Sequence, residues 1–463
     1  MHNVLRTAIQ FFGGRLFWLL APLLLLTWLP VQAASYTFPG NLPVGCSANS
    51  SGTYTCGALS LADRDTVTIG SPTPTTITVN GDFSTGTSSR INAGGVAANL
   101  TLVVIGKTDL GAGTATDGTY LNANVISGRV FTTGSYNHID GNITTIAGVV
   151  NIGSHNEITG KITTDSAAIN VGDNTTITGT ITTTIAGAIT IGVNSTVNGN
   201  ITTASGAINV GDNSTVNGSI LSTLAGAITL VSNVKVTGNV ATTYQGSVIG
   251  AGAITIGANS HVGGNVTTNT GAITVEAGAR VDRDVITNDG AITVGAGAKV
   301  GLSVCTGNSG AITIGADANV GGNVETAVAG AITVGTGASV TGAATVRGAG
   351  AKSIVGTAKV GKTMIGATCR SNSDNHDGTT TSSYCNGPNC ADACRGTDCT
   401  STKTLSTPPT CTGPNCSTCT GPNCSICTGP NCTCTGPNCT CTGAGCTVPL
   451  SIKSREWRQI FMR

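Results

Sequence analysis

Residues 252–275 read GAITIGANSHVGGNVTTNTGAITV, and close variants of this phrase recur along the chain every 19 or 20 residues. A repeat of this length is typical of a solenoid, in which each unit forms one coil. Within a unit, apolar and polar residues alternate, as in Ile254-Thr255-Ile256, and this is the period of a half-buried strand. Gly and Asn separate the runs and supply the positive backbone angles that corners need. The phrase therefore predicts stacked β-coils.

Twelve units can be marked by the first residue of each phrase, and one spacing, of 26 residues, is longer than the rest. The units begin at Gly128, Gly148, Ala167, Gly187, Gly206, Gly226, Gly252, Gly271, Gly290, Gly310, Gly330 and Gly350. If equivalent strands pair, the Ile and Val residues fill one continuous column. We therefore predict an all-β fold, a parallel and right-handed β-helix over residues 128–369. At about 4.8 Å per coil, its length is about 60 Å.

Four further segments flank these coils. Residues 1–33 are expected to be a signal peptide, and residues 34–127, where the alternation is weaker, an N-terminal cap with irregular first coils. Residues 370–446 form a cysteine-rich stalk, predicted to be an irregular tail, and residues 447–463 are a basic C-terminal segment.

The N-terminus has the pattern of an export signal. Arg6 and Arg15 precede the apolar run 16–31, and cleavage is expected after Ala33. The alternative is an uncleaved membrane anchor. No later stretch is long and apolar enough to span a bilayer, so no stable span is expected after cleavage. The 18 cysteines fit an oxidising compartment.

The overall charge argues against nucleic acid as a partner. Charged residues make up 9% of the 463 residues and the net charge is +1, whereas phosphate binding requires a basic surplus. No cofactor is indicated by any motif, and His138, His155 and His261 are expected at coil surfaces without metal-ligand spacing.

The tail carries seven Cys-x4-Cys units, most with Gly-Pro-Asn inside, a turn sequence that can bring two sulfurs together. We expect a local disulfide within each unit. The expected pairs are Cys385 with Cys390, Cys394 with Cys399, Cys411 with Cys416, Cys419 with Cys424, Cys427 with Cys432, Cys434 with Cys439, and Cys441 with Cys446.

The alternative for this tail is metal binding, because Cys416 and Cys419 form a Cys-x-x-Cys pair, as do Cys424 and Cys427. Cys305 and Cys369 lie in the repeat region without an assigned pairing.

Outward positions of the coils should line up as ladders. The ladder predicted for one face consists of Thr190, Asn209, Thr229, Thr255, Thr274, Thr293, Thr313 and Thr333. Thr suits an exposed strand, and its hydroxyls can bridge neighbouring coils. The alternative is a binding face for a glycan, another solenoid or ice, centred on Thr255, Thr274, Thr293, Thr313 and Thr333.

Three further segments are candidates for a catalytic site, a phosphate-binding site or a contact site. Residues 276–289 are the densest charge cluster, and Asp282 and Asp284 would be the acid and base of a polysaccharide-cleaving β-helix enzyme. A solvated face with local ion pairs is the simpler interpretation. Residues 356–363, GTAKVGKT, match the P-loop pattern by spacing but lie in a β-coil with no helix after them. The long spacing would project Tyr244 and Gln245 from the rod, most simply as a loop insertion.

The segment YTFPGNLPVGCSANSSGTYTCGALSLADRDTVTIGSPTPTTITVNGDFSTG, residues 36–86, followed by INAGG and NLTLVVIG, resembles the N-terminal region of MSHA pilus biogenesis proteins of the MshQ type. The resemblance implies a disulfide between Cys46 and Cys56 and a Gram-negative source. The coils of residues 128–369 are similar to bactofilins, polymer-forming β-helical proteins, which implies self-association, end to end or lateral.

The sequence thus favours a non-enzymatic exported protein, periplasmic, on the cell surface or extracellular, with a role in adhesion or pilus-associated structure. Its expected partners are further copies of itself, surface or pilus components, and glycans. The alternatives are a β-helix enzyme that cleaves polysaccharide at Asp282 and Asp284, and a Thr face that binds ice or glycan.

Overall fold

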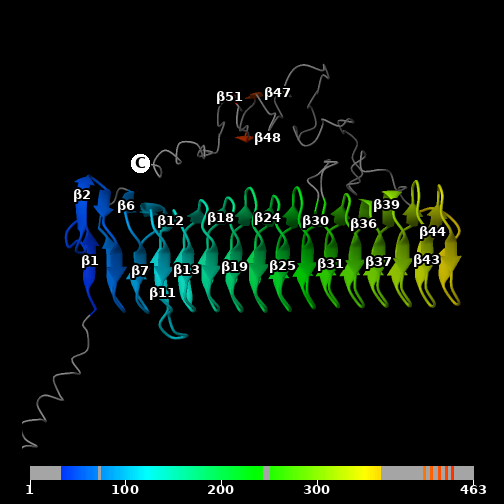
Figure 1. Cartoon of the computed structure of the whole chain (residues 1–463), viewed down its shortest axis with the longest axis horizontal. Helices are drawn as coiled ribbons and strands as arrows, with labels where there is room; N and C mark the ends of the chain where they lie inside the picture. The colour runs from blue at the N-terminus through cyan, green and yellow to red at the C-terminus, as the bar shows by residue number, and fades with distance from the viewer. Residues whose placement is uncertain are drawn as a thin grey trace, which may run out of the picture.

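The computed structural model describes residues 33–70, 74–242 and 251–365, and the backbone of five short strands between residues 410 and 442. Over residues 33–365 it confirms the predicted solenoid of parallel, stacked coils (Figure 1). One sheet contains 15 strands, against the twelve coils that the repeat marks. The additional coils come from the segment before Gly128. At about 4.8 Å per coil, the rod is about 70 Å long.

Each coil passes through three short strands, one in each of three sheets, which we call C, A and B in the order of the chain. Sheet A contains β1 (Ser35–Phe38), β5 (Thr66–Ile69), β8 (Arg90–Ile91), β11 (Thr119–Asn122), β14 (Asn137–Asp140), β17 (Glu157–Thr159), β20 (Thr176–Thr178), β23 (Thr196–Asn198), β26 (Thr215–Val216), β29 (Lys235–Val236), β32 (His261–Val262), β35 (Arg280–Val281), β38 (Lys299–Val300), β41 (Asn319–Val320), β44 (Ser339–Val346) and β46 (Lys359–Gly361).

Sheet B contains β2 (Cys46–Ser50), β3 (Thr53–Cys56), β6 (Thr75–Val79), β9 (Leu100–Val104), β12 (Asn124–Ser127), β15 (Ile143–Thr145), β18 (Ile162–Thr164), β21 (Ile181–Thr183), β24 (Ile201–Thr203), β27 (Ile220–Ser222), β30 (Val240–Ala241), β33 (Val266–Thr268), β36 (Val285–Asp289), β39 (Val304–Ser309), β42 (Val324–Thr326) and the second half of β44. A 3-10 turn, Ala97–Asn99, precedes β9.

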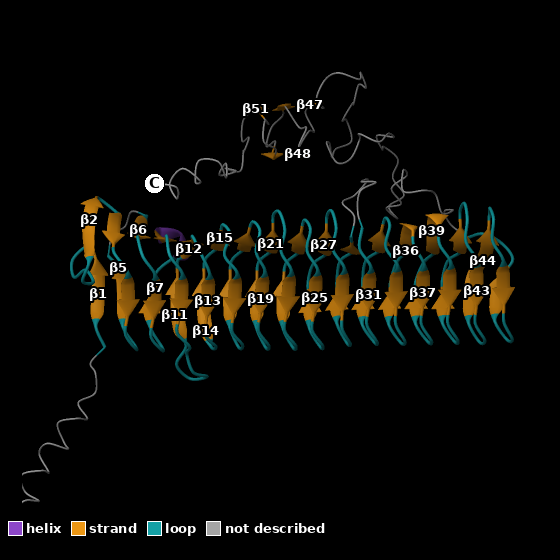
Figure 2. Cartoon of the chain, viewed as in Figure 1, coloured by secondary structure: helices purple, strands orange, loops and turns teal. Residues whose placement is uncertain are grey.

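Sheet C contains β4 (Leu59–Leu61), β7 (Phe83–Thr85), β10 (Thr108–Leu110), β13 (Phe131–Thr133), β16 (Val150–Ile152), β19 (Ile169–Val171), β22 (Ile189–Ile191), β25 (Ile208–Val210), β28 (Ile228–Leu230), β31 (Ile254–Ile256), β34 (Ile273–Val275), β37 (Ile292–Val294), β40 (Ile312–Ile314), β43 (Ile332–Val334) and β45 (Lys352–Ile354). Figure 2 shows these strands as rows joined by short turns.

The core is a stack of aliphatic side chains, because equivalent strands pair in register. One coil contributes Ile189 and Ile191 from sheet C, Val197 from sheet A and Ile201 from sheet B, all buried. Ile189, for example, pairs with Ile208 of the following coil. Burying each such side chain contributes about 1.5–3 kcal/mol, so the core grows with every coil added.

Most sheet B strands of the regular coils end in a buried Thr or Ser that points into the rod. The hydroxyl of Thr203 donates to the carbonyl of Gly187 at 3.1 Å, and that of Thr183 donates to Thr203 at 2.6 Å. These bonds hold the turn from sheet B to sheet C. Gly is required at this turn because a Cβ at Gly206 would lie 1.9 Å from the carbonyl oxygen of Gly187.

From β13 onward, the turn from sheet C to sheet A has one residue per coil in the left-handed region. Asn is frequent there because its short polar side chain tolerates this conformation. The residues at this corner are Tyr136, His155, Asn174, Asn194, Asn213, Asn233, Asn259, Gly278, Gly297, Asp317, Gly337 and Gly356. The column therefore accepts several side chains of different size at one backbone position.

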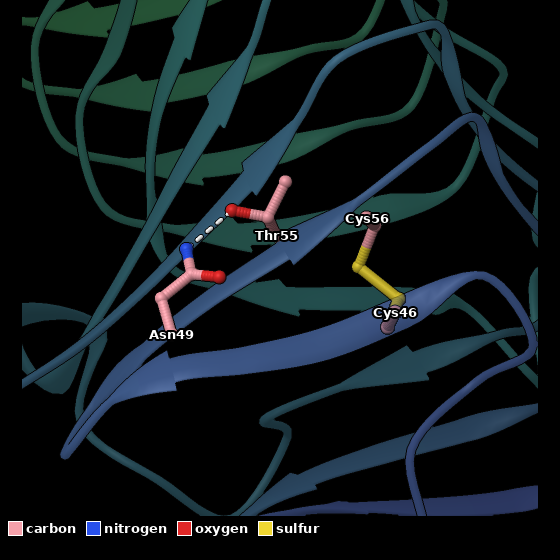
Figure 3. Close-up of a disulfide and its surroundings, with 4 residues drawn as sticks. All are labelled: Cys46, Asn49, Thr55 and Cys56. Atoms are coloured by element: carbon pink, nitrogen blue, oxygen red, sulfur yellow. Dashed lines mark hydrogen bonds between the residues drawn. A yellow bond between two sulfur atoms is a disulfide. The ribbon is translucent and has the colours of Figure 1, made fainter.

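The N-terminal end is closed by β2, which pairs antiparallel with β3 and lies at the end of sheet B. The Cys46–Cys56 disulfide that the MshQ-type resemblance implies is present and joins these two strands (Figure 3). Asn49 donates to the Thr55 hydroxyl across the same hairpin. An antiparallel end strand prevents a further coil from continuing the parallel stack on this sheet.

The last coil is built differently from those before it. Lys352 occupies the register position of the buried Ile332, and its Nζ donates to the carbonyl of Ala344 at 3.1 Å. Ile354 is 45% exposed, whereas its register partner Val334 is fully buried. A lysine at a core position disfavours the stacking of another coil on the described rod, and we call it the lysine cap.

The cysteine-rich segment contains five short strands. β47 (Thr410–Thr412), β49 (Ile426–Thr428) and β51 (Thr440–Thr442) form one parallel sheet, and β48 (Thr418–Thr420) and β50 (Thr433–Thr435) form another. The predicted irregular tail thus contains these five regular stretches, where equivalent Thr-Cys-Thr or Ile-Cys-Thr triplets pair with one another.

The predicted disulfides of the tail remain predictions, because each has at least one cysteine outside the described residues. The cysteines outside them are Cys385, Cys390, Cys394, Cys399, Cys416, Cys424, Cys432, Cys439 and Cys446. Their predicted partners Cys411, Cys419, Cys427, Cys434 and Cys441 lie in the five short strands, of which only the backbone is described. The metal alternative for Cys416, Cys419, Cys424 and Cys427 stays open for the same reason.

Other predictions also fall outside the described residues. They concern the signal peptide of residues 1–33, apart from its last residue, and the insertion with Tyr244 and Gln245. Cys369 is outside them as well, whereas Cys305, in β39, is disulfide-bonded.

Because buried and exposed residues alternate along each strand, substitutions at neighbouring positions should differ clearly in their effect on stability. Ile177→Ala removes a fully buried side chain between two similar aliphatic residues, and we expect a loss of about 2–5 kcal/mol in the free energy of unfolding. Thr178→Ala, one residue on and exposed, is the matched control and should change stability by less than about 0.5 kcal/mol. Urea denaturation followed by circular dichroism measures both, and equal effects would contradict the register described here.

Candidate functional site

The predicted Thr ladder forms on sheet C. Its members from Thr190 to Thr333 are register partners in successive strands and point outward, exposed or half-exposed. No hydrogen bond joins the hydroxyls of Thr255, Thr274, Thr293, Thr313 and Thr333, all of which the structure describes. Each of these strands is three residues long with one outward position, so the ladder is a single narrow column of hydroxyls.

Asp282 lies within a small ion-pair cluster on sheet A. One carboxylate oxygen is 2.8 Å from Nε2 of His261, and the other accepts from Nε of Arg280. His261 and Arg280 are register partners, with Lys235 before them and Lys299 after them. Partial burial by itself raises the pKa of Asp282, but the hydrogen bonds from Arg280 and His261 outweigh it, and the net pKa lies below the ordinary value.

Asp284 has a different environment, at the corner between sheets A and B, where it is 5% exposed. Its Oδ1 accepts the backbone N–H of Ser303 at 2.9 Å. Asn200, Asn239 and Asn265 use their side-chain oxygen in the same way, each toward the backbone N–H of the following coil. Asp284 thus makes the same bond to the next coil as these asparagines do.

The P-loop match does not form a phosphate site in the described residues. Lys359–Gly361 is strand β46, and no helix follows it as far as Ile365, where description ends. Nor do the described side chains include a group of three His, Cys, Asp or Glu residues placed to hold a metal ion. Within the described ranges, no helix is long and apolar enough to cross a membrane.

The most varied chemistry lies near the N-terminal end of sheet A, in a cleft that we call the aromatic cleft. It is lined by Thr114, Ala115, Thr116, Gly118, Tyr120, Tyr136, Asn137, His138, His155 and Glu157, and its volume is about 210 Å³. Two adjacent columns build it. Tyr120, His138 and Glu157 are register partners on sheet A, and Tyr136 and His155 occupy the left-handed corner position of successive coils.

The side wall of the cleft is the loop 111–118 between β10 and β11. It is longer than the equivalent turns of the following coils and hangs below their row near β11 (Figure 1). Asp117 fixes it, because its carboxylate accepts from Arg90 at 2.9 Å and lies 3.8 Å from Arg64. Gly113 N–H also donates to the carbonyl of Ser135 at 2.7 Å. The wall is therefore tied to the rod on both sides.

The rings in the cleft are packed against one another. Tyr136 and His155 are stacked, with centroids 4.7 Å apart and planes 17° apart. Tyr120 and His138 are tilted by 40° at 5.5 Å, and the guanidinium of Arg90 lies 4.9 Å from the Tyr120 centroid. Nδ1 of His138 is 3.2 Å from a carboxylate oxygen of Glu157. The result is a ring surface bordered by hydrogen-bonding groups.

One polar group lining the cleft has an unsatisfied donor. Asn137 is 2% exposed, and its Oδ1 accepts from the N–H of Gly113 at 3.2 Å. Its Nδ2 has no hydrogen-bond partner. That donor is itself buried beneath the surface of the cleft, so it belongs to the floor of the cleft and does not face a ligand. The accessible part of the cleft combines rings with a carboxylate and hydroxyls, which suits binding of a small polar molecule.

The structure brings together residues that the sequence alone did not associate. His138 and His155 lie at coil surfaces as predicted, but their contacts with Tyr120 and Tyr136 were missed. Two signals were present: the eight residues 111–118, rich in Gly and Thr, and four Tyr and His residues within 120–155, in a chain with 3% aromatics. Comparison with protein-family models, curated proteins and solved structures finds no match to this chain.

If Asp284 stabilises the fold through its acceptor oxygen, its negative charge should matter little for stability. Asp284→Asn keeps an oxygen that can accept the Ser303 N–H, so we expect the unfolding free energy to change by less than about 0.5 kcal/mol. Asp284→Ala leaves that N–H without its acceptor and should cost about 1–3 kcal/mol. Chemical denaturation of the two variants decides the point, and a large loss in Asp284→Asn would show that the negative charge itself is required.

The cluster around Asp282 should depend on pH. Since the folded-state pKa is lowered, its stabilisation is present above the unfolded-state pKa, about 4, and is lost as pH falls through the folded value. The stability difference between the wild type and Asp282→Asn should therefore be largest near pH 6 and shrink toward about pH 2. Denaturation at a series of pH values measures it. A difference that grows on acidification would contradict the assignment.

Proposed function

We propose that this protein is a non-enzymatic exported protein of a bacterial surface, in which the β-solenoid serves as a rigid rod for adhesion or a pilus-associated structure. The observation that carries the proposal is the continuous core of 15 coils. Many polar side chains near it, including the sheet B threonines and Asp284, are used to hold one coil on the next. Such an arrangement provides length and stiffness.

The alternative of a polysaccharide-cleaving enzyme depends on Asp282 and Asp284, and the environments of these two residues support it less well. Asp282 is bound by Arg280 and His261, and Asp284 accepts a backbone N–H. A glycosidase requires two carboxyl groups facing one substrate, one of them with a raised pKa. The lowered pKa of Asp282 is opposite to what a general acid at neutral pH requires.

Export and pilus association rest on the sequence of residues 1–33 and on the MshQ-type resemblance of residues 36–86. The Cys46–Cys56 disulfide supports an oxidising location, because such bonds persist there and are rare in the cytosol. The closed N-terminal end and the lysine cap at the last coil favour single rods of fixed length over growth by coil stacking.

Negative-stain electron microscopy of the protein purified from the exported fraction without reductant tests this proposal. We expect rods of one length, about 70 Å for the described coils, and labelling of intact cells by an antibody against the folded coils. As an activity control, the wild type and the Asp282→Asn/Asp284→Asn variant are incubated with acidic polysaccharides. Both should release no more reducing ends than the assay without protein. Compact particles, cytosolic protein, or cleavage lost in the double variant would overturn the proposal.

A further inference from the structure

Four rings that reach the surface of the rod lie at the aromatic cleft. Two of the four tyrosines and two of the three histidines among the described residues lie there, with Tyr120, Tyr136 and His138 half-buried and His155 exposed. By contrast, Phe38, Phe83 and Phe131 are buried in the core. Partly exposed rings gathered over three neighbouring coils, in a chain with 3% aromatics, indicate a surface with a role other than the stacking of coils.

The register of the solenoid shows that the coil itself does not require these rings. The positions that follow Tyr120, His138 and Glu157 in the same column hold Thr176, Thr196 and Thr215. The corner positions that follow Tyr136 and His155 hold Asn174, Asn194 and Asn213, with the same left-handed backbone. Tyr is also a costly choice there, since a bulky side chain is rarely found with positive φ. The rings are therefore explained by a ligand better than by folding.

We propose that the aromatic cleft binds a neutral saccharide, one or two pyranose units of a longer glycan. The C–H face of a pyranose ring packs on an aromatic ring, and Tyr combines such a surface with a polar end. The hydroxyls around the sugar ring need donors and acceptors at its edge. Glu157, His138 and Thr116, which line the cleft, supply these polar groups.

The charges around the cleft favour an uncharged sugar over an ionic ligand. Arg90 lies over Tyr120 and is paired with Asp117, so a ligand cation would have to displace it from the ring. A ligand carboxylate or phosphate would approach the Glu157 carboxylate, which lies beside His138. The cleft is open at the surface, and its volume of about 210 Å³ admits part of a chain that continues into solvent.

The test replaces the cleft with the residues of later coils. The variant Tyr120→Thr/Tyr136→Asn/His155→Asn removes three rings, and each new residue already occupies the equivalent position in other coils, so folding should be retained. Lys235→Thr, on the same column further along sheet A, is the matched control. The probe is an array of neutral oligosaccharides of hexose and N-acetylhexosamine units, followed by saturation-transfer NMR of the bound sugars with the full exported protein.

We expect the wild type and Lys235→Thr to bind the same sugars, and the triple variant to bind about tenfold or more weakly with an unchanged circular dichroism spectrum. No binding by the wild type, preference for charged glycans, or equal binding by the triple variant would overturn the inference. None of these outcomes changes the rod shape or surface labelling, so failure here is distinguishable from failure of the proposed function.

Discussion

The structure depends on one constraint, the parallel pairing of the strands in the regular coils with their equivalents one coil away, almost everywhere in register. Neighbouring strands of a sheet lie about 4.8 Å apart, so a side chain meets the residue at the same place in the next coil. A buried aliphatic residue inside the stack therefore packs on another aliphatic residue, and a turn residue on another turn residue. This is why the sequence repeats and why each position behaves as a column with its own physical requirement.

These columns determine how much could be read from the sequence. The alternation Ile254-Thr255-Ile256 and the spacing of the GAIT-like phrases were sufficient for the sheet C strands, the core and the outward Thr ladder. The coils before Gly128 were harder to recognise in the sequence, because their sheet C strands, such as Leu59–Leu61, lack the GAIT-like phrase. The buried Thr203 was not foreseen either, since a hydroxyl inside the rod is stable only through its bond to a turn carbonyl.

The aromatic cleft shows the limit of this reasoning. Tyr120 and His155 are far apart in the chain, and their proximity follows only when the columns are aligned around loop 111–118, whose length breaks the period. Asp284 shows a second limit, because a sequence does not reveal whether a carboxylate near another carboxylate bonds to the backbone. At this corner its oxygen accepts the backbone N–H of the next coil, as asparagine oxygens do elsewhere along the rod.

The direction of the hydrogen bonds between coils has a mechanical consequence. These bonds run along the rod, and the two ends of the described coils lie at opposite ends of the stack (Figure 1). A load applied between the ends passes through all coil interfaces in series, and a terminal coil, supported on one side only, yields first. Each yielding coil would release a short length of chain while the others remain intact, so the rod would lengthen in small, equal steps under tension.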